Sequence, residues 1–191
     1  MFPDPKLLTH ENIPKPLHGI NPRTIKGDIW WNDQRYEAYK THNYRCWACG
    51  IYKREAHYHK WLEAHETYDI NHQAATATFT GVVALCHVCH MFIHCGRMWN
   101  LYLYKEIPLS KVSHVMKRGF ALLAGAGLEP ALSAKIIDLQ MKGAQPEKIE
   151  KLLRADVNSI QQDWTKWHLV FEGQSYFSNF KNLDEWKEVY G

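Results

Sequence analysis

Four of the five cysteines in this sequence fall into two CxxC pairs, Cys46/Cys49 and Cys86/Cys89, and the fifth is Cys95. A CxxC pair places two sulfur atoms on one tight turn, and two such turns complete the tetrahedron that Zn²⁺ prefers. Two chance pairs of buried cysteines are the alternative, which the matched spacing disfavours. The sequence therefore predicts a closed structural zinc site on the two pairs, and places Cys95 on a helix as a small apolar residue.

A histidine run follows the second cysteine pair directly, with His90 and His94 four residues apart. On a helix this spacing places both imidazoles on one face, where they can chelate one ion. His65 reaches the same point if residues 56–66 and 78–85 pair as neighbouring strands. Isolated surface or core histidines are the alternative. The adjoining cysteine frame, which aims the helix, favours a second divalent ion on the three histidines.

Three further histidines are expected to stay outside the ligand shell of that ion. His57 and His59 alternate with His65 along the expected strand. Six residues at about 3.3 Å each would place His59 roughly 20 Å from His65. We therefore expect both to face strand neighbours or a substrate. His87 stands three residues before His90, and we expect it to face solvent, with a substrate as the alternative.

Proline, glycine and apolar spacing predict the elements that position these residues. Five prolines within residues 1–27 predict an extended N-terminal arm. Asp28 is a suitable N-cap for the helix that follows it. The elements expected around the site are a helix over 29–42, a strand over 56–65, a loop over 66–77, a strand over 78–85 and a helix over 89–103.

The remainder of the chain predicts helices first and a small sheet after them. Apolar residues at helical spacing, with proline at the starts, predict helices over 109–126, 130–141 and 146–155. An aromatic stretch over 164–180 predicts a β-hairpin that turns at Glu172-Gly173. A short terminal helix is expected over 183–190.

Together these elements predict an α+β protein in three parts. Residues 1–27 form the extended arm, residues 28–107 the zinc and histidine domain, and residues 108–191 a mainly helical region with the aromatic hairpin and short helix. No internal repeat or low-complexity tract argues for another division. The boundary between the second and third parts is expected near Pro108, which ends the preceding helix.

The composition is that of an ordinary globular protein, with 46% hydrophobic and 23% charged residues. No apolar run approaches the roughly 20 residues that a membrane helix needs. The first residues lack the apolar centre of a secretion signal, so we expect a cytoplasmic protein with no membrane partner. The formal net charge of +3 is the sum of +5 in residues 1–128 and −2 in residues 129–191. This basic excess is compatible with DNA as a partner and equally with an ordinary surface.

A particular combination of these motifs resembles a known family. The first CxxC pair, then Leu-Glu-Ala-His-Glu at 62–66, then Ala-Leu-Cys-His-Val-Cys-His at 84–90 with a histidine four residues later, is similar to the zinc-stapled branch of the HNH endonucleases of phage and bacterial type. The resemblance covers about residues 46–97. It implies a ββα-metal core within residues 28–107 and metal-dependent hydrolysis of DNA phosphodiester bonds.

By this resemblance His65 is the first ligand of the catalytic ion, and His90 and His94 are its helical ligands. The ion would be Mg²⁺, Mn²⁺, Ni²⁺ or Zn²⁺, in addition to the structural Zn²⁺. The family places a second histidine after the first as general base, where this chain has Glu66, a weaker base at neutral pH unless burial raises its pKa. A structural asparagine of the family is replaced by Gly81. His72 or His87 is an alternative base.

Basic side chains beside the site are candidates for phosphate contacts, because such side chains bind the nucleic-acid backbone. They are Lys53, Arg54, Lys60 and Arg97.

Two other functions stay open. One is a nucleic-acid-binding module on the same frame with a lapsed active site, favoured by Glu66 and Gly81. The other is a phage-type interaction or inhibitor factor that binds a protein through residues 108–191. Its aromatic side chains could line a partner surface, although packing a small core is the commoner reason for them. They are Trp164, Trp167, Tyr176, Phe177, Phe180 and Trp186.

Overall fold

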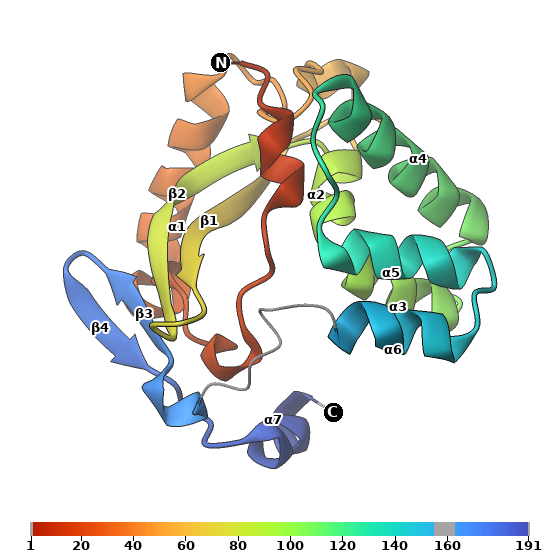
Figure 1. The fold of residues 1–191 in the computed structure, drawn as a ribbon. Coiled ribbons are helices and arrows are strands. Elements are labelled where there is room, and N and C mark those ends of the chain that lie inside the picture. The colour runs from red at the N-terminus through yellow and green to blue at the C-terminus, as the bar shows by residue number, and fades with distance from the viewer. Residues whose placement is uncertain (1, 155–162, 191) are drawn as a thin grey trace. The chain divides into compact units, whose positions relative to one another are not determined.

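The computed structural model of the protein describes residues 2–154 and 163–190 (Figure 1). Within these ranges the chain folds as a mixed α/β protein with seven α-helices and one four-stranded sheet in the order β1-β2-β3-β4. The expectation of a mixed α and β fold is therefore confirmed. No helix among the described residues is long and apolar enough to cross a membrane.

Contacts divide the described chain into two compact units, each assembled from three segments. The first unit contains residues 2–11, 38–65 and 83–154, and the second contains residues 12–37, 66–82 and 163–190. Three elements contribute residues to both units: α1 (Pro22–Thr41), β1 (Glu63–Asn71) and β2 (Thr76–Leu85). The three-part division at residues 27 and 107 follows composition rather than contacts, and it stays a prediction.

The first unit is mainly helical. Its complete helices are α2 (His87–Ile93), α3 (Cys95–Leu103), α4 (Leu109–Gly125), α5 (Leu132–Met141) and α6 (Pro146–Arg154). Helix α2 packs against α3, α4 and the 3-10 helix η1 (Pro5–Thr9), and α3 also contacts α4 and α5. Buried apolar side chains of α2, α3 and α4 form one core with the cysteines. The short α2 is thereby held from several sides.

The second unit is built on the sheet. Strand β3 (His168–Phe171) pairs in parallel with β2, with Thr76 opposite His168, and antiparallel with β4 (Gln174–Phe177). Leu17, Trp167 and Leu169 are buried in its core. Of the aromatic residues proposed for a partner surface, Trp167 is therefore a core residue, whereas Phe177 is exposed.

Most C-terminal elements agree with the sequence analysis. Helix α4 matches the expected helix closely, and so does α7 (Leu183–Tyr190). The hairpin turns at Glu172 and Gly173, both at positive φ (50° and 74°), as a tight two-residue turn requires. The expected helix over 146–155 is α6, and its last expected residue lies outside the described residues.

The extended arm expected over residues 1–27 is wrong in part. The segment contains two 3-10 helices, η1 and η2 (Lys15–Leu17), and α1 already begins at Pro22. Proline is compatible with the first turn of a helix, where its missing N–H has no partner in any case. Gly27 (φ 84°) interrupts α1, so the helix expected from residue 29 is the part after this break.

The strand expected over 56–65 and the loop over 66–77 are also wrong in part, since only residues 63–65 of the former are strand and only residues 72–75 of the latter lie outside the strands. Strand β1 begins only at Glu63, because Tyr58 adopts φ 69° and turns the preceding chain away from an extended path. The polar residues after 65 belong to the strand, since their side chains pair within the sheet. The Thr80 hydroxyl donates to the Thr67 hydroxyl (2.8 Å), which donates to the Gly81 carbonyl (3.2 Å).

The contact between α2 and α4 predicts the effect of a single methyl group. Gly119→Ala is expected to destabilise the first unit by about 1–3 kcal/mol through overpacking, because the new Cβ would collide with the ring of the buried Phe92. The matched control is Gly125→Ala on the same helix, where a Cβ meets nothing within 4 Å. Urea unfolding measures both variants, and equal stabilities would contradict the close approach of the two helices.

Candidate metal centres

The first cysteine pair lies on a tight turn that follows α1. The Cys46 amide donates to the Ile51 carbonyl (2.9 Å), and the Gly50 amide donates to the Cys46 carbonyl (2.8 Å). Gly50 has φ 75°, a conformation that glycine adopts without strain. This closed turn brings the sulfurs of Cys46 and Cys49 to the same side.

The second pair stands at the beginning of α2. Cys86 is the N-cap residue of that helix, and Cys89 lies in its first turn. The Trp47 amide of the first turn donates to the Ala84 carbonyl at the end of β2 (2.7 Å). This hydrogen bond brings the two cysteine turns together.

The four sulfurs fit a tetrahedral zinc ion. Their ligand atoms all lie within 4.8 Å of one another, and the Sγ atoms of Cys49 and Cys86 are 3.8 Å apart. Zn–S bonds of about 2.3 Å require sulfurs separated by about 3.8 Å in a tetrahedron. A disulfide would require about 2.05 Å, and all five cysteines are free thiols. The donor set and the spacing therefore suit one structural metal ion.

The thiols share charge in a way that also calls for a cation. Hydrogen bonding to Cys46 lowers the pKa of the Cys49 and Cys86 thiols, whereas hydrogen bonding to Cys49 raises the pKa of Cys46. The pKa of Cys89 is raised in the same way by Cys46. Adjacent thiolates repel one another, so only some of the four ionise without a metal.

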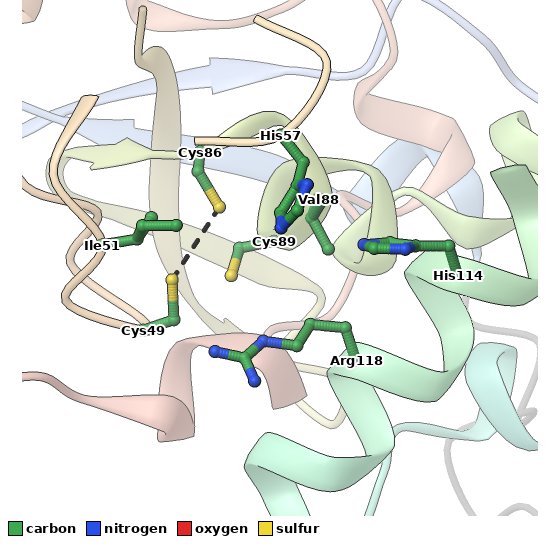
Figure 2. Close-up of a pocket in the computed structure, with 8 residues that line it drawn as sticks. All are labelled: Cys49, Ile51, His57, Cys86, Val88, Cys89, His114 and Arg118. Carbon is green, nitrogen blue, oxygen red and sulfur yellow. Dashed lines mark hydrogen bonds between the residues drawn. The ribbon is translucent and has the colours of Figure 1, made fainter. Parts of the chain in front are cut away.

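A pocket of about 330 Å³ adjoins the cysteine cluster (Figure 2). Its lining includes Cys49, Cys86 and Cys89 together with His57, His114 and Arg118. Figure 2 shows the Arg118 side chain extending from α4 towards the cysteines. A zinc ion with four thiolates carries a net charge of −2, and this guanidinium is placed to offset part of it.

The structure brings together the three histidines that the sequence singled out. One nitrogen each of His65, His90 and His94 lies within 4.8 Å of the others. Nε2 of His94 is 3.2 Å from Nδ1 of His65. Zn–N bonds of about 2.0–2.1 Å place two tetrahedral nitrogen ligands about 3.3 Å apart. The group therefore has the spacing of a metal site with an open coordination position.

Burial keeps two of these imidazoles neutral. Desolvation, together with the neighbouring His94 and His90, lowers the pKa of His65 to about 2. Desolvation and the neighbouring His90 and Arg97 lower the pKa of His94 to about 4. A neutral imidazole is the form that binds a metal ion, so these two ligands need not lose a proton at neutral pH.

Glu63 orients the third imidazole, and the sequence analysis missed it. Its Oε2 contacts Nδ1 of His90, and its Oε1 is 2.7 Å from Nδ1 of His87. Burial acts to raise the pKa of Glu63, but hydrogen bonds from His87 and His90 outweigh it, and the pKa lies below its usual range. Metal-binding histidines commonly donate their second N–H to a carboxylate. A glutamate two residues before His65, on the same strand face, was the signal available in the sequence.

Two histidines lie elsewhere than the sequence suggested. His87 is buried, with 8% of its surface exposed, instead of facing solvent. His59 lies close to Glu63, with 3.9 Å between Nε2 and Oε1, because residues 57–62 do not form the expected strand. His59, Glu63 and His87 form a second group whose ligand atoms lie within 4.8 Å of one another.

The structure places Glu66 in the second unit, where its carboxylate accepts a hydrogen bond from the Tyr68 hydroxyl (2.6 Å). Adjacent residues of a strand point to opposite faces, so Glu66 and His65 point away from each other. Burial raises the pKa of Glu66, which makes it a better base than an ordinary carboxylate. Gly81 adopts φ 146°, a backbone conformation in which asparagine would be strained.

The four basic residues near the site have different surroundings. Nζ of Lys53 stands 4.1 Å from the centre of the Tyr44 ring, and Nζ of Lys60 donates to the Ala56 carbonyl (3.1 Å). Arg54 and Arg97 are exposed. Arg97 is close enough to His94 to contribute to its lowered pKa. Phosphate binding by these residues stays a prediction.

Comparisons with known proteins do not assign a function to this chain. No protein-family model, no curated protein and no solved structure matches this chain. The function is therefore argued from the geometry of the cysteine and histidine groups.

The four-cysteine group, if it holds zinc, predicts different outcomes for two buried cysteines. Cys89→Ser is expected to abolish the thiolate charge-transfer band of the cobalt-substituted protein and to unfold the first unit, because structural zinc commonly contributes about 10–16 kcal/mol of binding free energy. Cys95→Ser is the control, since Cys95 is equally buried but lies outside the cluster. It should retain the band. Loss of the band in both variants would show that it reports general unfolding.

The lowered histidine pKa values predict a stability that decreases with acid. Below about pH 6.5 the unfolded chain takes up protons at His65 and His94, whereas the folded chain does so only near about 2 and about 4. Each histidine then removes up to about 1.4 kcal/mol per pH unit. Without added divalent cations, urea unfolding at pH 7 and pH 5 should show a smaller loss for a His65→Asn/His94→Asn variant than for wild type. An equal loss would contradict this burial.

Proposed function

We propose that this chain is an HNH-like, metal-dependent endonuclease that hydrolyses DNA phosphodiester bonds. The observation that carries the proposal is the convergence of His65, His90 and His94 beside a closed four-cysteine frame. A closed sulfur site holds structure, whereas three imidazoles leave positions for water and substrate. The pairing of one site of each kind suits a small nuclease whose own core is limited.

The order of elements supports a ββα-metal core. Strands β1 and β2 are neighbours in the sheet, and α2 follows β2 directly. His65 lies on β1, His90 on α2, and His94 at the C-cap of that helix. This is the arrangement of ligands that the resemblance to HNH endonucleases implies.

In the proposed reaction the three histidines would hold one divalent ion. Such an ion would offset negative charge on the scissile phosphate and the leaving oxygen. Glu63 keeps the His90 ring oriented through Nδ1, which leaves Nε2 for the ion. The exposed Arg54 and Arg97 are the proposed contacts to neighbouring phosphates, since arginine binds phosphate oxygens in a bidentate manner.

A binding module with a lapsed site is the second candidate. The observation in its favour is the hydrogen bond from Tyr68 to Glu66, which occupies the carboxylate proposed as general base. Such a module would bind DNA with a strong dependence on salt and no dependence on divalent ions. The two candidates therefore differ in chemistry more than in affinity.

Plasmid nicking tests the proposed function. Wild-type protein is expected to cleave in Mg²⁺, Mn²⁺ or Ni²⁺ and to be inactive without divalent ions. His90→Ala should reduce the rate by more than about 100-fold, because loss of an outer-shell partner alone commonly costs 10–100-fold. The fold should persist in that variant, since His90 is only partly buried and the cysteine frame is intact.

The matched control is His168→Ala in the second unit. Among the described residues, its imidazole forms a hydrogen bond with the Lys166 carbonyl and contacts the Phe177 ring. This variant should cleave like wild type. If folded, zinc-loaded wild type binds DNA without divalent ions and does not cleave it, the nuclease proposal is wrong and the binding module is supported. Equal loss in both histidine variants would point to misfolding, whereas undiminished cleavage by His90→Ala would point to a contaminating nuclease.

A further inference from the structure

We propose that His59, Glu63 and His87 form a second site for a divalent cation, next to the His65, His90 and His94 group. The ligand atoms of the three side chains lie within 4.8 Å of one another. All three belong to the first unit, and two of them, Glu63 and His87, lie at the start of β1 and of α2. The inference stands on this geometry and does not require that the protein cleaves DNA.

Glu63 Oε1 is the centre of the proposed site. It lies 2.7 Å from Nδ1 of His87 and 3.9 Å from Nε2 of His59. Ligands at about 2.0–2.2 Å from one ion are separated by about 3–3.5 Å. An ion therefore needs only small movements, the larger one by His59, whose side chain is about one third exposed (32%).

The surrounding rings hold the two imidazoles in place. The His59 ring stacks on Trp61, with centroids 4.3 Å apart and planes at 11°, and meets the His87 ring edge-on at 4.3 Å. Tyr58 also contacts the His87 ring, at 5.6 Å between centroids. The Lys111 ammonium, which faces this cluster, stands over the Tyr58 ring at 4.7 Å. His59 and His87 thus have few alternative orientations.

The donor set selects the class of cation. Two imidazoles and one carboxylate suit Zn²⁺, Co²⁺ or Ni²⁺, whereas Mg²⁺ and Ca²⁺ prefer oxygen ligands alone. Three protein ligands also leave a position for water, as catalytic zinc sites do. On the proposed nuclease function, this water would be a source of hydroxide beside the first histidine group, because zinc lowers the pKa of bound water to about 7.

The carboxylate of Glu63 connects the two sites. Oε1 belongs to the proposed second site, and Oε2 contacts Nδ1 of His90, a ligand of the first. His59 belongs to the second group alone and His94 to the first alone. Substituting each of these two histidines therefore separates the sites, whereas substituting Glu63 would disturb both.

Cobalt titration of protein that carries zinc only in the cysteine cluster tests the proposal. Wild type should bind two Co²⁺ per chain, measured by calorimetry and by visible ligand-field bands. A thiolate charge-transfer band would reveal exchange of zinc at the cysteines, and we expect none. His59→Ala and His94→Ala should each bind one. His168→Ala is the matched histidine control and should bind two.

A stoichiometry of one in wild type, or of two in His59→Ala, would overturn the second site and leave Glu63 as a hydrogen-bond acceptor for His87 and His90. If His59→Ala fails to fold, His59→Gln and the wild-type stoichiometry decide. Cleavage is scored separately on the same samples. Binding of two cobalt ions without cleavage would support the second site and contradict the nuclease proposal. Binding of one ion with cleavage would contradict the second site and support the nuclease proposal.

Discussion

Four sulfur atoms that suit a single cation are the constraint on which the first unit depends. They join a turn after α1 to the first turn of α2, and Cys49 and Cys86 are 37 positions apart in the chain. Adjacent thiolates repel one another, so a metal at this place replaces repulsion by attraction. Because Cys86 and Cys89 stand at the start of α2, the same cluster determines which way that helix presents its histidines.

A carboxylate surrounded by imidazoles is the second constraint, and it links structure to chemistry. Glu63 is half-buried, so its charge is costly unless it is paired. Contacts with His87 and His90 supply the pairing and orient both rings. Nδ1 of His87 forms a hydrogen bond with Glu63 when the proposed second site is empty, and would bind the metal ion when that site, beside His59, is occupied. One side chain thereby serves two groups of histidines.

Local signals made much of the C-terminal structure predictable. Proline and apolar spacing determine where α4 begins and ends, and Glu172-Gly173 has the backbone freedom of a tight turn. Strand β1 was placed too early, because aromatic and polar residues alternate before residue 63 without forming a strand. Tyr58 has a positive φ, a conformation that the residue types in that segment do not predict. The polar half of β1 was missed, since the Thr67 hydroxyl pairs with Thr80 of β2, a partner that only the sheet provides.

The sequence by itself determined the two cysteine pairs of the cluster and the convergence of His90 and His94, because residues three or four positions apart share one turn or one helix face. It also supplied His65, through a resemblance and through the pairing of two strands. Only the tertiary structure decided that His59 and His87 meet at Glu63 and that Thr80 contacts Thr67 across the sheet. Contacts between separate elements depend on where the chain reverses, and one residue's difference in a strand sends a side chain to the opposite face.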